Sequence, residues 1–164
     1  QALEHMHVHR LIHHTVCTEH VFVGGTGHIM LSGMSSVEHR DAYEMQTDAV
    51  IRGIPQFMSP EMLRRLPHNG KVDFWALGCL MFELLTGWGP FHDPDVGEIV
   101  RRSTMGIFYF PPDVSANARA TIKSLLEIEV SSRTGSVGTL REQTFFHGVH
   151  WDALQSTSAP SVFV

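Results

Sequence analysis

The sequence predicts a mainly α-helical fold: a helical bundle around one buried central helix, with a small β-hairpin near the start of the chain. Residues 73–86 are apolar on almost every side, which is typical of a helix in the middle of a domain. Residues 21–31 join two short β-favouring runs through a Gly-rich turn, which is the pattern of a hairpin. Helix-start signals recur after the hairpin, so most of the remaining chain is expected to be helical.

The length and composition indicate a single domain. The chain has 164 residues, of which 43% are hydrophobic and 18% are charged, so it can bury a core. We place the domain at residues 1–154 and expect a flexible tail at residues 155–164, where Ser recurs.

Charge and cysteine content argue against several classes of protein. Lys and Arg number 12 against 17 Asp and Glu, a net charge of -5, so we expect no nucleic-acid partner. No apolar run approaches the roughly 20 residues that span a bilayer, so no membrane association is expected. The polar, His-rich start predicts no signal peptide. The two cysteines, Cys17 and Cys79, cannot build a disulfide framework, which favours an intracellular, cytoplasmic protein.

The first nine residues are expected to form a helix. His5 and His9 lie four positions apart and share a helix face, a spacing that can hold zinc. A solvated His-rich face is the simpler interpretation, because no Cys or carboxylate completes a ligand set.

The middle of the chain predicts a loop and then two helices. Residues 32–54 are polar and lack periodicity, so we expect a long surface loop. Residues 59–61, Ser-Pro-Glu, are typical of the first turn of a short helix. The central helix can be capped by Asp73 and ended by Gly87.

Three further helices are expected towards the C-terminus. Residues 93–94, Asp-Pro, start one that ends near Gly106, and residues 110–112, Phe-Pro-Pro, break the chain. Ser115 caps the next helix. Residues 139–142, Thr-Leu-Arg-Glu, predict a capping box before the last short helix.

Several short motifs occur in the order in which protein kinases have them. They are GIPQFMSPE (53–61), VDFWALGC (72–79), LTGWGPF (85–91), SRTG (132–135) and FFHGVHWDAL (145–154). With these motifs the chain resembles the C-terminal lobe of a eukaryotic Ser/Thr protein kinase, most closely the cyclic-nucleotide-dependent branch of the AGC type. The resemblance implies that the N-terminal lobe is absent from this chain.

The resemblance also places the catalytic loop at residues 13–20, where the family has His-Arg-Asp-Leu-Lys-Pro-Glu-Asn. Thr15 stands at the position of the catalytic base, and Cys17 stands at that of the lysine that steadies the phosphoryl group. His20 replaces an Asn that holds magnesium. Gly33 replaces the Asp of the Asp-Phe-Gly motif, which is the main magnesium ligand.

These replacements predict a protein that is not an enzyme. A Thr hydroxyl is not basic near pH 7. Imidazole is a poor ligand for magnesium, and glycine offers no side chain. We therefore expect a pseudokinase that uses neither ATP nor magnesium and acts as a protein-interaction or scaffold module.

Two alternative functions stay open. One is an active Ser/Thr kinase with unorthodox catalytic residues, using Asp41 or Asp48. The other is a His-rich metal-binding protein on a kinase-like fold.

The resemblance assigns structural roles to several residues that the chain keeps. Asp73 would accept hydrogen bonds from the backbone of the catalytic loop, and Glu61 would pair with Arg133. His13 would join an apolar stack with Met34 between the lobes. The hairpin and Met34 should form an apolar face, which usually marks an interface.

A peptide groove is the remaining candidate site. In the branch that this chain resembles, acidic residues hold arginines of the substrate peptide, and Glu19 and Glu83 stand at two such positions. Ile54 replaces a Thr in the floor of that groove. We therefore expect a protein partner with an Arg-containing segment. The alternative is that Glu83 pairs internally or reaches solvent.

Overall fold

The computed structural model describes residues 1–39, 53–154 and 156. Its α-helices are α1 (Ala2–Val8), α2 (Pro60–Leu63), α3 (Lys71–Thr86), α4 (Val96–Met105), α5 (Ala116–Leu125) and α6 (Val137–Arg141). Its strands are β1 (Leu11–Ile12), β2 (Val21–Val23), β3 (Ile29–Leu31) and β4 (Glu38–His39). Its short 3-10 helices are η1 (Thr18–His20), η2 (Met34–Ser36), η3 (Pro55–Phe57), η4 (Thr144–Phe146) and η5 (Trp151–Ala153). The described part of the chain is thus mainly helical, as the sequence predicts.

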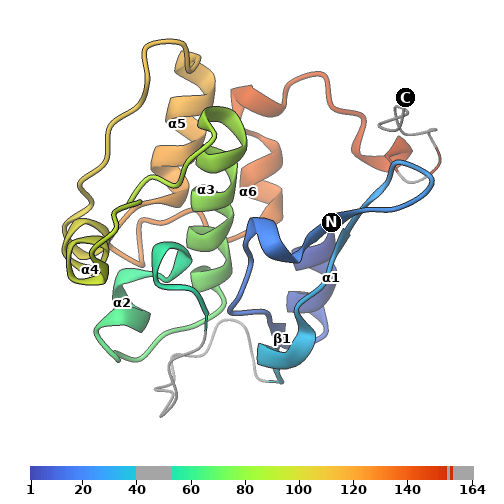
Figure 1. Cartoon of the computed structure of the whole chain (residues 1–164). Coiled ribbons are helices and arrows are strands. Elements are labelled where there is room, and N and C mark those ends of the chain that lie inside the picture. The colour runs from blue at the N-terminus through green and yellow to red at the C-terminus, as the bar shows by residue number, and fades with distance from the viewer. Residues whose placement is uncertain (40–52, 155, 157–164) are drawn as a thin grey trace.

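Helix α3 lies at the centre of the fold, with the other helices around it (Figure 1). Trp75 and Cys79 on this helix are fully buried, and the Trp75 ring stacks on Phe91 with the ring centroids 5.5 Å apart. Helix α5 packs closely against α3, because a Cβ added at Gly78 would lie 2.9 Å from the Leu125 side chain. Glycine at this position therefore lets the two helices approach each other.

The start of helix α3 differs from the prediction, and its end agrees with it. The helix begins at Lys71 with Gly70 as N-cap, so Asp73 lies inside the first turn and does not cap it. Its carboxylate binds another segment of the chain instead. The helix ends at Gly87, whose φ of +87° is the left-handed conformation that glycine adopts at helix ends.

Two small antiparallel ladders lie on the N-terminal side. The predicted hairpin is β2–β3, in which Val21 pairs with Leu31, and it extends away from the helices (Figure 1). A second ladder, β1–β4, pairs Ile12 with Glu38. The sequence placed residues 32–39 in a long surface loop, and this was wrong for η2 (Met34–Ser36) and β4 (Glu38–His39). Strands of two residues have no local pattern, so only pairing with a distant segment reveals them.

Two helices begin at residues other than those predicted. Helix α4 is capped by the carboxylate of Asp95, which accepts a hydrogen bond from the Gly97 amide at 2.9 Å, and not by Asp93. Helix α6 is capped by the hydroxyl of Ser136, which accepts from the Thr139 amide at 3.1 Å. In both cases a second cap-forming residue stands close by, and side-chain geometry decides between the two.

Part of the predicted apolar face is exposed. The side chains of Phe22, Ile29 and Met34 are 52%, 71% and 53% exposed, whereas Val21 packs against the core. Among the residues that the structure describes, no helix combines the length and the hydrophobicity that crossing a bilayer requires. The expected tail at residues 155–164 lies outside the described residues except for Ser156, and so do Asp41 and Asp48.

Candidate functional site

The segment that resembles a catalytic loop, residues 13–20, lies against the segment that follows the hairpin. The His13 Nε2 atom is 2.7 Å from the Ser32 carbonyl oxygen, and the Ser32 amide donates to the His20 carbonyl oxygen at 2.8 Å. A carbonyl oxygen only accepts, so Nε2 of His13 carries the proton. These bonds bring the four positions that depart from the kinase pattern into one region: Thr15, Cys17, His20 and Gly33.

Thr15 joins the two segments through its hydroxyl. The side chain is buried, and its Oγ1 donates to the Gly33 carbonyl oxygen at 3.3 Å. The Thr15 amide donates to Nδ1 of His13 at 3.2 Å, which agrees with a proton on Nε2 of that ring. The hydroxyl is therefore a donor within the protein, a role that a carboxylate could not fill.

The position of the His20 ring depends on the absence of a side chain at Gly33. The His20 Nδ1 atom lies 2.7 Å from the Thr15 carbonyl oxygen and 3.4 Å from the Cys17 sulfur. A Cβ at Gly33 would overlap with the His20 ring, and the φ of Gly33 is +85°. The missing side chain at position 33 therefore creates the space that the imidazole fills.

The residues at these positions do not fit a magnesium ion. Magnesium prefers oxygen ligands in octahedral geometry. Gly33 offers no ligand, and Nδ1 of His20 already binds the Thr15 carbonyl oxygen. Within residues 1–39, 53–154 and 156, no group of three or more His, Cys, Asp or Glu is placed to hold a metal ion. The metal-binding alternative therefore gains no support from His5 and His9.

The variant Gly33→Ala tests whether the His20 ring leaves no room for a side chain at position 33. We expect Gly33→Ala to lower the free energy of unfolding by about 2–4 kcal/mol, because left-handed strain adds to steric overlap. In a His20→Ala background the overlap disappears, so only about 1–2 kcal/mol of strain should remain. Urea denaturation of the wild type, the two single variants and the double variant measures both values. Gly148 is a matched control, because its φ is +88° and no atom lies within 4 Å of an added Cβ. Equal penalties at Gly33 in the two backgrounds would show that the ring does not occupy this space.

Asp73 fixes the catalytic-loop segment to helix α3. Its buried carboxylate accepts hydrogen bonds from the backbone amides of His13 at 2.9 Å and His14 at 2.8 Å. The His7 Nε2 atom lies 2.8 Å from the same carboxylate. His7 could not be found from the sequence, because its partner is 66 residues away and no local pattern connects them.

Glu61 and Arg133 form a buried ion pair in which both carboxylate oxygens are used. The Arg133 Nη1 atom is 2.6 Å from Oε1 of Glu61, and Nη2 is 3.0 Å from Oε2. Lys71 supports the same region, since its Nζ donates to the carbonyl oxygens of Val130, Ser131 and Arg133. No local sequence pattern indicates this role of Lys71.

The apolar stack expected for His13 and Met34 would join this lobe to an upper lobe, and it stays a prediction. Within this chain the His13 ring is buried in polar contacts with Ser32 and Thr15, and the Met34 side chain is 53% exposed.

Glu83 lies in the last turn of helix α3, and only one of its two carboxylate oxygens has a hydrogen-bond partner among the described residues. Its Oε1 atom accepts a hydrogen bond from the Thr18 hydroxyl at 3.3 Å. Its Oε2 atom is buried without a hydrogen-bond partner among the described residues. One oxygen therefore pairs internally, as the alternative interpretation expected, while the other stays unpaired.

The other two groove candidates differ in exposure. The Glu19 side chain is exposed, and Ile54 is half-buried against the core. Glu19 directly follows Thr18, whose hydroxyl donates to Glu83, so the segment that carries Glu19 lies beside helix α3. Burial raises the pKa of the Cys17 thiol, and the charges of Glu19 and Glu83 also raise it. Two of the three groove candidates, Glu19 and Glu83, therefore lie on neighbouring segments.

Comparison with known proteins decides the family. The protein kinase domain matches residues 1–146 of this chain. The chain belongs to the protein kinase family. It is 28% identical to a RAC family serine/threonine-protein kinase homolog of Dictyostelium discoideum, over 99% of this chain and 37% of that protein.

Two further relatives have a comparable percentage identity to this chain. The chain is 32% identical to the serine/threonine-protein kinase sck1 of Schizosaccharomyces pombe, over 99% of this chain and 24% of that protein. It is 30% identical to a probable cAMP-dependent protein kinase catalytic subunit of Encephalitozoon cuniculi, over 99% of this chain and 50% of that protein. The chain thus spans half or less of the length of these relatives.

Membership of the kinase family corrects two predictions. The sequence analysis predicted a protein that is not an enzyme and that uses neither ATP nor magnesium. The relatives are named as Ser/Thr protein kinases, and their similarity runs along the whole chain. Protein kinases transfer a phosphoryl group from ATP with magnesium ions. Both predictions are therefore wrong, because they rested on four positions, whereas the similarity rests on the whole chain.

Proposed function

We propose that this chain is the substrate-binding, C-terminal lobe of a Ser/Thr protein kinase and that Glu83 binds an arginine of the protein substrate. The observation that carries this proposal is the unpaired Oε2 atom of Glu83, which is buried at the outer end of helix α3. A buried carboxylate oxygen without a donor costs about 1–3 kcal/mol. A ligand that supplies the missing donor recovers that free energy.

The chemistry of the missing donor favours arginine. A guanidinium group presents two parallel N–H donors and can bind both oxygens of a carboxylate. The Thr18 hydroxyl occupies one direction around Oε1, and Oε2 has no donor among the described residues, so a fork that reaches Oε2 would supply the missing hydrogen bond. The exposed carboxylate of Glu19, which directly follows Thr18, adds negative charge that attracts a basic peptide.

Calorimetry with an Arg-containing peptide tests the groove. Glu83→Gln keeps the size of the side chain and removes its charge, so we expect affinity to fall by about tenfold or more. Raising the salt concentration should weaken binding to the wild type. Glu142→Gln removes the same charge from an exposed position at the end of α6 and should bind like the wild type. Equal affinity of Glu83→Gln and wild type would refute the groove and leave the substrate surface elsewhere.

Phosphoryl transfer by an unorthodox site is the second candidate, and membership of the kinase family favours it. The described residues at positions 15, 20 and 33 do not supply a base or magnesium ligands. Asp41 and Asp48 could supply carboxylates, and both lie outside the described residues. Transfer of labelled phosphate to an Arg-containing peptide that Asp41→Asn or Asp48→Asn abolishes would support this role. Transfer that both variants retain would reject it.

A role as an interaction or scaffold module stays a prediction. If it uses the peptide groove, the same calorimetry tests it without any assumption about catalysis.

A further inference from the structure

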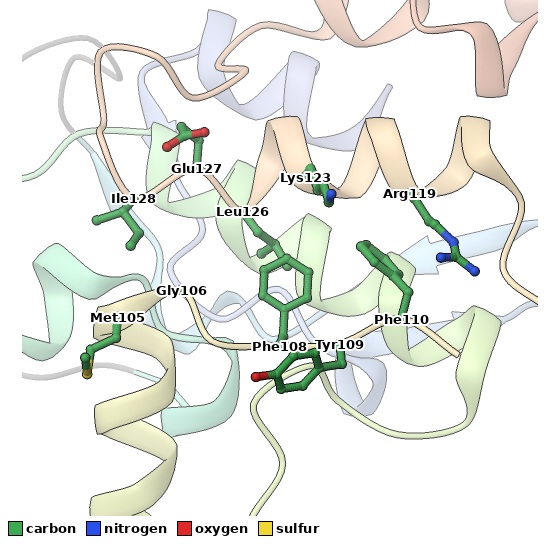
Figure 2. A pocket seen from close by; sticks show the side chains of 10 residues that line it. All are labelled: Met105, Gly106, Phe108, Tyr109, Phe110, Arg119, Lys123, Leu126, Glu127 and Ile128. Atoms are coloured by element: carbon green, nitrogen blue, oxygen red, sulfur yellow. The ribbon is translucent and has the colours of Figure 1, made fainter. Parts of the chain in front are cut away.

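An aromatic pocket lies between the end of helix α4 and the end of helix α5 (Figure 2). Its volume is about 560 Å³, and it opens to solvent along one side. We call it the aromatic pocket and define it by Met105, Phe108, Tyr109, Phe110, Lys123 and Leu126. None of the residues that line it is a groove candidate, since Glu19, Ile54 and Glu83 are not among them.

The floor of the aromatic pocket is fixed to the core. The Phe108 and Phe110 rings meet nearly edge to face with centroids 5.4 Å apart. Phe108 also contacts Phe82 and Phe91, with centroids 6.1 Å and 5.6 Å away. Figure 2 shows the Phe108 ring pointing towards Leu126 on the α5 side. A floor that is already ordered costs little conformational entropy when a ligand binds.

Arg119 holds one wall of the pocket in place. Its guanidinium donates to the carbonyl oxygens of Pro111 at 2.8 Å, Pro112 at 2.9 Å and Val114 at 2.7 Å. It also lies over the Phe110 ring, 5.7 Å from the centroid. These partners are neutral, and Arg119 forms no ion pair with a carboxylate of the described residues, so its positive charge remains at the pocket.

The rim carries groups that have no partner within the described part of the chain. The Tyr109 side chain is 83% exposed and makes no hydrogen bond there, and Met105 is 58% exposed. The exposed Lys123 ammonium forms no ion pair with any described residue. Glu127 lies on the same rim, but Figure 2 shows its carboxylate turned away from Lys123. Exposed Tyr and Met side chains beside a rigid apolar floor are typical of protein interfaces.

We propose that the aromatic pocket binds an extended acidic peptide segment of a partner protein. An aromatic side chain of that segment packs on Phe108 and Phe110, and a neighbouring carboxylate pairs with Lys123. The charges of Lys123 and Arg119 select an acidic segment and orient it, because Glu127 repels a carboxylate at the other end of the rim. The open side favours an extended chain, since a small ligand would stay largely exposed there.

Fluorescence anisotropy with labelled peptides tests the proposal on the whole chain. The probe is a short peptide with one Phe followed by two Glu residues, compared with the same peptide carrying Lys in place of Glu and with one carrying Ala in place of Phe. We expect only the acidic, aromatic peptide to bind. Binding should weaken as salt is added. Lys123→Glu and Tyr109→Ser should each weaken it by ~5-fold or more.

Arg10→Glu is the matched control, because it makes the same charge change at an exposed residue outside the pocket. It should bind the acidic peptide like the wild type. Equal binding by Lys123→Glu and Arg10→Glu, or no binding of the acidic peptide to the wild type, would overturn the proposal.

Binding of the acidic peptide at the aromatic pocket and binding of the Arg-containing peptide at Glu83 are separate hypotheses, and each can be refuted without the other. Glu83→Gln should leave binding of the acidic peptide unchanged, and Lys123→Glu should leave binding of the Arg-containing peptide unchanged. If Glu83→Gln instead removed both, the acidic peptide would not be bound at the aromatic pocket.

Discussion

Arg133→Ala should lower the free energy of unfolding by about 3–5 kcal/mol, because it leaves the buried carboxylate of Glu61 without its cation. The Arg133 side chain is almost fully buried and uses its donors on Glu61, on the Glu127 carbonyl oxygen at 2.8 Å and on the Ile128 carbonyl oxygen at 3.3 Å. It also lies over the Trp75 ring, 5.0 Å from the centroid. The measurement is denaturation in urea followed by circular dichroism.

Two further variants separate the ion pair from general packing. The double variant Glu61→Ala/Arg133→Ala should cost less than the sum of the single variants, because each single change leaves one charge unpaired. Additive costs would show that the two side chains are not partners. Arg101→Ala breaks an exposed pair with Glu98 on helix α4 and should change stability little, because solvent screens that pair.

Asp73→Asn is expected to destabilise the chain by about 2–4 kcal/mol. The two oxygens of Asp73 receive the His13 amide, the His14 amide and Nε2 of His7. An Asn side chain replaces one oxygen by an NH₂ group, so at least one of these buried donors would face another donor. Thermal unfolding measures the loss of stability.

The control for Asp73 is Asp113→Asn, which makes the same exchange at an exposed carboxylate with no hydrogen bond to the described residues. It should melt like the wild type. If Asp73→Asn also melted like the wild type, the hydrogen bonds to the catalytic-loop segment would contribute nothing to stability.

The prediction that this protein is not an enzyme was wrong, because the similarity to protein kinases runs along the whole chain. It treated Thr15, His20 and Gly33 as separate losses from a catalytic pattern. In the structure they form one arrangement, in which the Thr15 carbonyl oxygen holds His20 and the missing side chain of Gly33 makes room for the ring.

Local signals were enough to predict several elements. The apolar run of α3, the Gly-rich turn between β2 and β3 and the hydroxyl of Ser115, which caps α5 by accepting from the Ala118 amide at 3.2 Å, all act over a few residues. Their physical causes are burial of an apolar surface and satisfaction of free amides at a helix start. The resemblance to kinase motifs, which also reads local stretches, identified the right family.

By itself, the sequence determined the helical fold, its central helix and its kinase family, because these depend on patterns within short segments. Only the tertiary structure decided the β1–β4 ladder, the contact of His7 with Asp73, the unpaired oxygen of Glu83 and the aromatic pocket. Each of these depends on side chains or strands from distant parts of the chain. Their positions follow from how the helices pack around α3, and no periodicity in the sequence records that packing.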